Sequence, residues 1–165
     1  MMDSMSRLFE HELEDIYYAE HKLVKALEDL AGESTSPAIK QAFSEHKTQT
    51  EGHVKRLDHV FEALGEKPSS TKCAGIEGLI EEKRDFAKEK PAPEVLDLFN
   101  LGAGLKSERY EISAYEGLIA MARQMGLREA EHYLMQNLSE EEQALSTVKV
   151  LMQSMLPQSA VASRR

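Results

Sequence analysis

The sequence has little of several features that other folds and functions need. Its 165 residues include a single cysteine, Cys73, and no tryptophan, and aromatic residues make up only 6%. One cysteine cannot form an intramolecular disulfide or supply a cluster of thiolate metal ligands. The scarcity of aromatic residues argues against a β-sandwich, because strands favour aromatic and β-branched side chains. A single all-α domain is therefore the expected class.

Positive charge and long apolar runs are also scarce. The 20 Lys and Arg residues stand against 29 Asp and Glu residues, which gives a formal net charge of −9. Such an acidic chain repels phosphate backbones, so nucleic acid is not an expected partner. A membrane-spanning helix needs about 18 apolar residues in a row, and no such run occurs. The charged N-terminus also lacks a signal-peptide core, and we expect a cytoplasmic protein with no membrane partner.

Apolar residues recur at helical spacing along almost the whole chain. Four long helices are predicted, at about residues 6–31, 37–64 and 93–126, and from the region after Gly126 to Pro157. Residues 66–92 are predicted to hold a loop, a short amphipathic helix and a proline-containing break. No segment shows the alternation of a strand. We expect one domain over residues 1–156 and a disordered tail over residues 157–165.

The lengths of the connections predict how the helices are arranged. Short turns make the first two helices and the last two helices antiparallel pairs. The connection between the pairs is long enough to run the full height of a bundle whose helices are each about 40 Å long. A four-helix bundle with one long crossover containing a short helix is the ferritin-like arrangement, and this is the predicted fold.

Several polar residues occupy positions where this fold needs apolar ones. Glu20, Glu108 and Glu141 lie on the apolar faces of the first, third and fourth long helices, and His46 and His53 lie on that of the second. Burying an unpaired carboxylate costs free energy, so three such residues indicate that they have a common function.

The depths of these residues along the bundle also agree. Glu20 and His46 each lie thirteen residues from Glu33 in the first turn, and Glu111 and Glu141 each lie fifteen residues from Gly126 in the second. At about 1.5 Å per residue, both pairs are about 20 Å from their turns. The four helices therefore bring acidic and imidazole groups to the middle of one core.

Carboxylate and imidazole groups in an apolar bundle favour iron or manganese over magnesium, which prefers oxygen ligands and water. Ferritin-like dimetal sites combine one Glu on each of two helices with a Glu/His pair three residues apart on each of the other two. The corresponding pairs here are His46 with Gln49 and Glu108 with Glu111. This is close to the dimetal pattern but not identical to it.

Five stretches of the sequence resemble a known family. They are LFEHELEDIYYAEHKLVKAL, QAFSEHKTQTEGHVKRL, KCAGIEGLIEE, SERYEISAYEGL and NLSEEE. In this order and spacing, over roughly residues 7–155, they resemble the YciE/YciF-type bacterial stress proteins. The resemblance implies a ferritin-like bundle, usually a homodimer, with a dinuclear metal motif in its core and a role in the stress response.

The resemblance also implies the ligands of that motif. Carried over to this chain, the metal-binding positions are Glu20, His46, Gln49, Glu108, Glu111 and Glu141. Glu140 or Glu141 fits the fourth-helix motif, and Glu141 is preferred because it lies on the apolar stripe. Family members commonly have Glu at the position of Gln49, so one strong and one weak metal site are plausible here.

The predicted function is a metal-binding protein with one or two iron or manganese ions that oxidises Fe(II) or consumes peroxide. The alternative is a non-enzymatic helical homodimer with a structural or vestigial metal site, and a mini-ferritin cage is a third interpretation. His53 is interpreted as a peripheral residue or an indirect contact, and Tyr115 as a hydrogen-bonded core residue. His11, His21, His59 and His132 are interpreted as surface residues.

Overall fold

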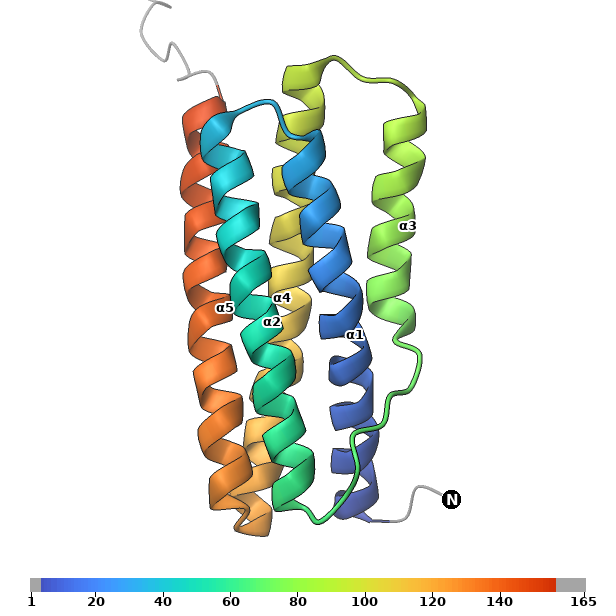
Figure 1. Ribbon diagram of the computed structural model, residues 1–165, viewed down its shortest axis with the longest axis vertical. Coiled ribbons are helices and arrows are strands. Elements are labelled where there is room, and N and C mark those ends of the chain that lie inside the picture. Colours follow the sequence, from blue (N-terminus) through green and yellow to red (C-terminus); the bar gives the residue numbers. More distant parts are fainter. Residues whose placement is uncertain (1–3, 157–165) are drawn as a thin grey trace, which may run out of the picture.

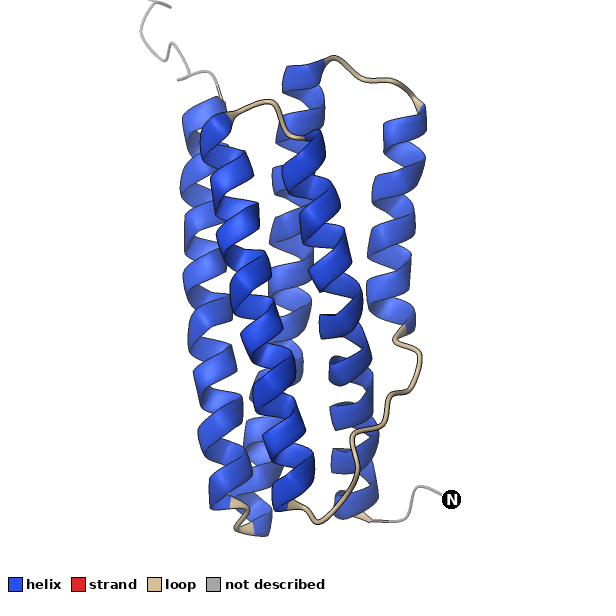
Figure 2. Cartoon of the chain, in the orientation of Figure 1, coloured by secondary structure: helices blue, strands red, loops and turns tan. Residues whose placement is uncertain are grey.

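A computed structural model describes residues 4–156, which form five helices joined by loops (Figure 1). The helices are α1 (Met5–Glu33), α2 (Pro37–Ala63), α3 (Ala74–Lys88), α4 (Pro93–Met125) and α5 (Arg128–Met155). Within this part of the chain there is no strand (Figure 2). The predicted helices all form, with ends that differ by a few residues. The predicted tail, residues 157–165, lies outside the described residues.

Four long helices form the bundle, and α3 lies outside it (Figure 1). Helix α1 packs on α2, α4 packs on α5, and the two pairs meet through contacts of α2 with α5 and of α1 with α4. The chain passes from one end of the bundle to the other between α2 and α4, and α3 contacts α4 and α1 on the way. The structure therefore confirms the all-α bundle with one long crossover that contains a short helix.

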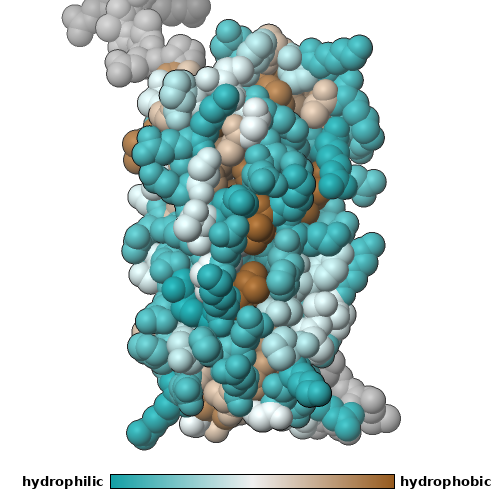
Figure 3. Space-filling model, in the orientation of Figure 1, coloured by the Kyte–Doolittle hydropathy of each residue, from teal (hydrophilic) through white to brown (hydrophobic). Residues whose placement is uncertain are grey.

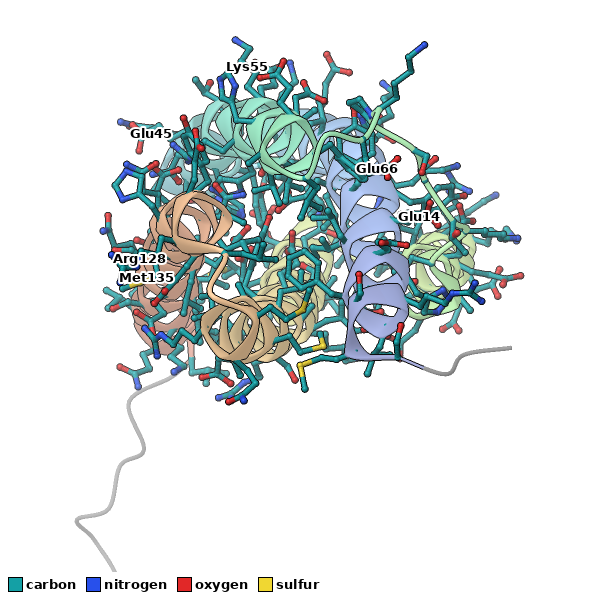
Figure 4. All side chains as sticks on the ribbon, turned by 90° about the horizontal axis from the view of Figure 1, so that it is seen from below. Glu14, Glu45, Lys55, Glu66, Arg128 and Met135 are labelled. Carbon is teal, nitrogen blue, oxygen red and sulfur yellow. The ribbon has the colours of Figure 1, made fainter. Side chains whose placement is uncertain are left out.

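The first half of the crossover is fixed to α1 by Glu14. This carboxylate accepts hydrogen bonds from the hydroxyls of Ser69 and Thr71, the second at 2.8 Å. The two hydrogen bonds hold the pKa of Glu14 below its usual range. Figure 4 shows Glu14 on the side of α1 that faces the crossover. This part of the connection is therefore held against α1 and is not a free linker.

The start of α3 is fixed by a buried cysteine. Cys73 caps this helix, since its sulfur accepts from the backbone N–H of Ile76, and it lies 3.1 Å from the hydroxyl of Tyr110. Burial raises the pKa of the Cys73 thiol. A side chain at Gly75 would place a Cβ atom 2.5 Å from the Tyr110 ring, so only glycine fits there. Cys73 lies in the crossover between the two helix pairs, but its side chain is buried and is a structural part of the core.

The turn between α1 and α2 is closed by a residue from a different helix. Asp97 of α4 accepts hydrogen bonds from the backbone N–H groups of Thr35 and Ser36, at 2.8 and 3.0 Å, and from the Thr35 hydroxyl. These hydrogen bonds satisfy N–H groups at the start of α2 that have no partner within the helix. The turn between α4 and α5 instead uses Gly126 in the left-handed conformation, with φ of 72°. Both turns hold their helix pairs in register.

The apolar core consists of two separate clusters. The larger one lies towards the α4–α5 turn and includes Phe9, Leu13, Leu57, Leu118 and Leu134. The smaller one lies towards the α1–α2 turn and is formed by Leu27, Leu30, Ile39, Phe43, Leu101 and Val148. Between the two clusters, all four long helices place buried polar side chains in the core.

The surface is largely polar. The face seen in Figure 3 is mostly hydrophilic, with small hydrophobic patches between polar side chains. His11, His21, His59 and His132 are exposed, as predicted. No helix among the described residues is both long enough and apolar enough to cross a membrane. The apolar face of α3 is largely used within the chain, because Ile76 is buried and Phe86 stacks on Phe99 with ring centres 3.8 Å apart.

Candidate metal centre

Six buried side chains from the four long helices form one cluster between the two apolar regions. This carboxylate–histidine cluster consists of Glu20 of α1, His46 and His53 of α2, Glu108 and Glu111 of α4, and Glu141 of α5. Each residue follows the same three-and-four spacing as the apolar residues on its helix, so helix packing buries it along with them. Five of the six predicted ligands are in the cluster, and His53 is an addition.

Two overlapping groups of three ligands lie within the cluster, and in each group one ligand atom per residue lies within 4.8 Å of the others. The His53 group is Glu20, His53 and Glu141, and the His46 group is His46, Glu108 and Glu141. His53 Nδ1 lies 2.8 Å from Glu141 Oε1 and 3.4 Å from Glu20 Oε1. His46 Nε2 lies 3.3 Å from Glu141 Oε2 and 3.1 Å from Glu108 Oε1. The two oxygens of Glu141 therefore face different histidines.

These distances match the separation of ligand atoms around one metal ion. Two ligand atoms that are each about 2.1 Å from an ion, at right angles to one another, lie about 3 Å apart. The nitrogen–oxygen distances of both groups, 2.8 to 3.4 Å, include this value. Each group therefore has a size that suits a single ion.

Unpaired polar atoms are concentrated in this cluster. Among the described residues, eight buried side-chain nitrogen and oxygen atoms have no hydrogen-bond partner, and six of them belong to the cluster. They are Glu20 Oε2, His53 Nδ1, Glu108 Oε2, Glu111 Oε1 and both oxygens of Glu141. Leaving a buried acceptor unpaired costs about 1–3 kcal/mol, and more for a charged one. A bound cation would satisfy these lone pairs, so the residues present fit a metal ion.

Burial disfavours the charged form of the carboxylates when no ion is bound. Desolvation by burial raises the pKa of Glu108 to about 7 and that of Glu141 to about 8, and the charge on Glu20 contributes to both shifts. The pKa of Glu111 is raised well above its usual range by burial and by the charges of Glu141 and Glu20. A divalent ion would reverse this preference and release the protons.

His53 belongs to the cluster, where its Nδ1 atom faces Glu20 and Glu141, so the prediction of a peripheral residue is wrong, and its alternative, an indirect contact, stays a prediction. Its exposed fraction is 0%. Burial alone would lower its pKa, but the carboxylates of Glu20 and Glu141, which face its Nδ1 atom, outweigh burial and raise it to about 10. Without a metal ion, His53 is therefore a cation that offsets part of the negative charge around it.

The wrong prediction for His53 arises because the depth along the bundle is counted from Glu33, which is not the centre of the turn between α1 and α2. Helix α1 ends at Glu33 and α2 begins at Pro37, so the midpoint of the turn is Thr35 rather than Glu33. Fifteen residues from Thr35 in either direction are Glu20 and Thr50. His46 and His53 lie four residues before and three residues after Thr50, so both reach the level of Glu20.

Each of the two buried imidazoles uses its second nitrogen on an oxygen outside the cluster. His53 Nε2 lies 2.9 Å from Glu140 Oε2, and His46 Nδ1 lies 3.3 Å from Gln49 Oε1. With an ion bound, an acceptor on the second nitrogen would keep a proton there and leave the lone pair of the first nitrogen for the ion. Metal-binding histidines commonly have this arrangement, and it orients both rings towards the cluster.

A chain of hydrogen bonds supports the His53 group from behind. Glu140 forms an ion pair with Arg56, and Arg56 Nε donates to Asn137 Oδ1 at 2.5 Å. Asn137 Nδ2 donates to the Tyr115 hydroxyl at 2.9 Å, and this hydroxyl donates to Glu20. Tyr115 is fully buried, as the interpretation of a hydrogen-bonded core tyrosine requires. The chain fixes Glu20 at one end and holds the imidazole partner Glu140 at the other.

Sequence analysis missed Arg56 and Asn137, although each left a signal. Asn137 occupies a stripe position on α5, one turn before Glu141, where an apolar residue is expected. Arg56 follows His53 by three residues on α2 and therefore lies on the same side of the helix. The polar residue on an apolar stripe could have been found, but the pairing of Arg56 with α5 required the structure.

Gln49 and Glu111 occupy different positions relative to the two groups. The Gln49 side chain is half-buried and contacts His46 Nδ1, on the opposite edge of the ring from the nitrogen that faces Glu108. Glu111 is buried beside Glu20 and belongs to neither group of three. Its unpaired Oε1 atom is available to an ion in the cluster.

Comparisons with known proteins identify a family. The sequence profile of the family described as a domain of unknown function, DUF892, matches residues 4–161. Protein YciF of Escherichia coli is 37% identical to this chain over 141 residues, which cover 85% of each protein.

Two solved structures are similar over almost their entire length. The crystal structure of the Escherichia coli stress protein YciF matches with a TM-score of 0.89 and 34% identity, over 93% of this chain and 98% of that one. The structure of YcfI from Rhodopseudomonas palustris matches with a TM-score of 0.88 and 36% identity, over 90% of this chain and 94% of that one. A Xanthomonas campestris protein with 17% identity and a TM-score of 0.73 shares the fold.

Proposed function

The chain belongs to the DUF892 family and is a relative of the stress protein YciF, and on this basis we propose that it binds iron or manganese in its bundle core and acts in the stress response. The observation that carries the proposal is the pair of overlapping ligand groups that share Glu141. Two groups of this size support a dinuclear centre. We propose the cytoplasm as its location.

Different residues of the cluster would hold the two ions. Glu141 would contribute to holding both, because its two oxygens face the two histidines. Glu20 and His53 would complete one side, and His46 and Glu108 the other. Glu111 lies close enough to Glu20 to add a further carboxylate. The apolar clusters above and below exclude water and strengthen these interactions.

Bound iron or manganese would supply one-electron redox chemistry with O2 or peroxide. We propose oxidation of Fe(II) or consumption of peroxide, because small reactants of this kind need no larger substrate pocket. Ion binding would release protons from the cluster, since burial raises the pKa of both Glu108 and Glu141 in the metal-free protein.

Metal content per chain, measured by mass spectrometry after anaerobic loading with Fe(II), tests this proposal. We expect up to two ions in the wild-type protein and none in Glu141→Gln, which keeps the size of the side chain but removes its charge. Glu142→Gln is the matched control, because Glu142 is adjacent in sequence and exposed. Equal metal content in the two variants would place the ions outside the cluster. Metal-dependent loss of peroxide or Fe(II), absent in Glu141→Gln, is the expected activity.

A non-enzymatic structural protein is the second candidate, and Gln49 favours it. An amide at this position gives the imidazole of His46 a neutral partner, where family members commonly have a carboxylate. His53 can also offset part of the cluster's charge as a cation without any metal. This candidate predicts that Glu141→Gln changes the free energy of unfolding at most, with no loss of any catalysed reaction.

We also propose that the protein is a homodimer. An apolar hollow of about 310 Å³ lies on α3 and α4 and is lined by Phe86, Val95, Leu98 and Phe99 among others. Val95 is half-exposed there and adds to a contiguous apolar surface of the kind found at protein–protein contacts. Sedimentation of the wild-type protein is expected to give a dimer, and Val95→Lys is expected to weaken it. A monomer at all concentrations, or a larger cage, would contradict the proposal.

A further inference from the structure

A polar pocket of about 240 Å³ lies between α2 and α5, directly beside the cluster. It is lined by Ala42, Phe43, Glu45, His46, Gln49, Gln143, Ala144, Thr147 and Val148. Glu45, Gln143 and Thr147 are exposed, whereas Phe43, His46 and Ala144 are buried. The pocket therefore extends from the surface of the bundle to one of the imidazoles of the metal centre.

His46 forms the boundary between this pocket and the cluster. Its exposed fraction is 6%, whereas that of His53 is 0%. One edge of its ring contacts Gln49, a lining residue, and the other edge lies 3.1 Å from Glu108 and 3.3 Å from Glu141. One side chain therefore contacts both the pocket and the ligand carboxylates.

The lining of the pocket suits a hydrated cation. Its polar groups are the carboxylate of Glu45, the amides of Gln49 and Gln143 and the hydroxyl of Thr147, all of which offer oxygen atoms. Divalent ions such as Fe²⁺ and Mn²⁺ bind oxygen and exchange their water ligands for it. The lining contains no lysine or arginine. By contrast, the hollow between α1 and α3 is lined in part by Lys83 and Arg84.

The centre is covered at its other histidine. His53 Nε2 is covered by Glu140, which is itself paired with Arg56. A second surface pocket of similar size, about 210 Å³, is lined by Tyr110, Ser113 and Leu118 among others and by no residue of the cluster. The pocket beside His46 is therefore favoured as an entrance by its contact with a ligand, and its polar lining without lysine or arginine distinguishes it from the hollow between α1 and α3.

We propose that the pocket between α2 and α5 is the route by which hydrated divalent cations enter the metal centre, with His46 as the first ligand they meet. This inference rests on the proposed metal-binding function. Ala144 controls the width of the route at its inner end, because it is a small buried residue one turn after Glu141. Glu45 supplies negative charge at the outer end, where Figure 4 shows it on the outside of the bundle.

The rate of metal binding tests the route separately from the metal site itself. Metal-free protein is mixed with Co(II) in a stopped-flow instrument, and the visible absorption of bound Co(II) gives both the rate and the final stoichiometry. Thr147→Phe and Ala144→Leu narrow the pocket without changing any ligand. We expect both variants to bind Co(II) about tenfold or more slowly, with the final stoichiometry of the wild-type protein.

Ser113→Phe is the matched control, because Ser113 is exposed and lines the other pocket. It is expected to bind Co(II) at the wild-type rate. Thr147 is exposed, so Thr147→Phe still tests the route if Ala144→Leu fails to fold. Full stoichiometry with unchanged rates in Thr147→Phe would overturn the route alone. Absence of bound Co(II) in the wild-type protein would overturn the metal centre and the route together.

Charge at the entrance provides a second test. Glu45→Lys reverses the charge at the outer end of the pocket, so we expect binding to slow several-fold at low salt and the difference to shrink as salt is added. Glu116→Lys makes the same change at an exposed position on α4 and is expected to have a smaller effect. Equal effects of the two variants would show that only net charge matters and would count against this entrance.

Discussion

The two halves of the cluster differ in how they are supported and in how they meet solvent. The His53 group is sealed, and its residues are held by the hydrogen-bonded chain of Tyr115, Asn137, Arg56 and Glu140. The His46 group adjoins a polar pocket, and the one partner on the far edge of its imidazole is the neutral amide of Gln49. The His53 group is therefore both buried and held by hydrogen bonds, whereas the His46 group is accessible from the pocket and has weaker support.

This difference suggests unequal metal affinities. A charged acceptor behind a metal-binding imidazole makes the ring a better ligand than a neutral amide does. Glu140 provides such an acceptor at 2.9 Å, whereas Gln49 lies at 3.3 Å. We therefore expect the His53 group to bind its ion more tightly and the His46 group to exchange its ion more quickly.

Removing a carboxylate that belongs to only one group should give the largest difference between the two halves. Glu20→Gln is expected to lose the ion of the His53 group, and Glu108→Gln that of the His46 group, so each variant retains one ion of two. The remaining ion should be tightly held in Glu108→Gln and weakly held in Glu20→Gln. Titration with Mn(II), followed by electron paramagnetic resonance of the free ion, measures the number of bound ions and their affinity in each variant. Identical affinities in the two variants would remove the distinction between the halves.

Removing the support of the sealed half should have the next largest effect. Glu140→Ala leaves His53 Nε2 without its acceptor and Arg56 without its partner. Loss of such a partner typically costs 10–100-fold in metal affinity, and we expect this for the tighter ion alone. Competition with a coloured chelator measures the affinity of each site. Glu142→Ala, an exposed neighbour, is the control and should retain the wild-type affinities.

A gain of affinity is predicted for the open half. Gln49→Glu would place a carboxylate behind the His46 imidazole, and we expect the weaker ion to bind up to about tenfold more tightly. Gln143→Glu adds the same charge to the same pocket at an exposed position. If both variants bind the weaker ion more tightly by the same factor, the added charge in the pocket explains the increase in affinity. The contact of residue 49 with His46 would then not be its cause.

The smallest expected effect is the change in stability of the metal-free protein with pH. The folded-state pKa values of Glu108, Glu141 and His53 lie above their ordinary values, at about 7, 8 and 10. The folded state therefore binds more protons than the unfolded state between about pH 4.5 and pH 10, so stability falls as the pH rises through that window.

Thermal unfolding of the metal-free protein at pH 5 and pH 9 checks this expectation, with a lower midpoint at pH 9. Added Mn(II) should offset the loss most at high pH, because the ligands bind metal in their deprotonated forms. A Glu108→Gln/Glu141→Gln double variant is the control and should show a weaker dependence on pH. A midpoint that rises from pH 5 to pH 9 in the metal-free wild-type protein would contradict the raised pKa values.

The fold could be predicted because its determinants are local. Apolar residues at three-and-four spacing, Pro37 and Pro93 at helix starts and Gly126 at a helix end mark the long helices directly in the sequence. The long segment between two short-turn pairs then restricts the topology to a bundle with a crossover. The attachment of that crossover by Glu14 and the closure of a turn by Asp97 depend on contacts between distant segments, which no local pattern encodes.

The candidate centre could be predicted only in part. A glutamate on an apolar stripe is visible in the sequence, which is how Glu20, Glu108 and Glu141 were found. The place of His53 in the cluster was missed because a two-residue error in the centre of a turn moves the level of the opposite helix by about 6 Å. The pairing of Arg56 with Glu140 was invisible because the two residues lie 84 positions apart.

The carboxylate–histidine cluster is proposed to hold two ions, and the most direct measurement of this is an anomalous difference map from crystals soaked in Mn(II). We predict two peaks in the bundle core, one bounded by Glu20, His53 and Glu141 and the other by His46, Glu108 and Glu141. The peak beside His53 should be the stronger at low Mn(II). A core without peaks, in crystals that carry Mn(II) on their surface carboxylates, would contradict the account.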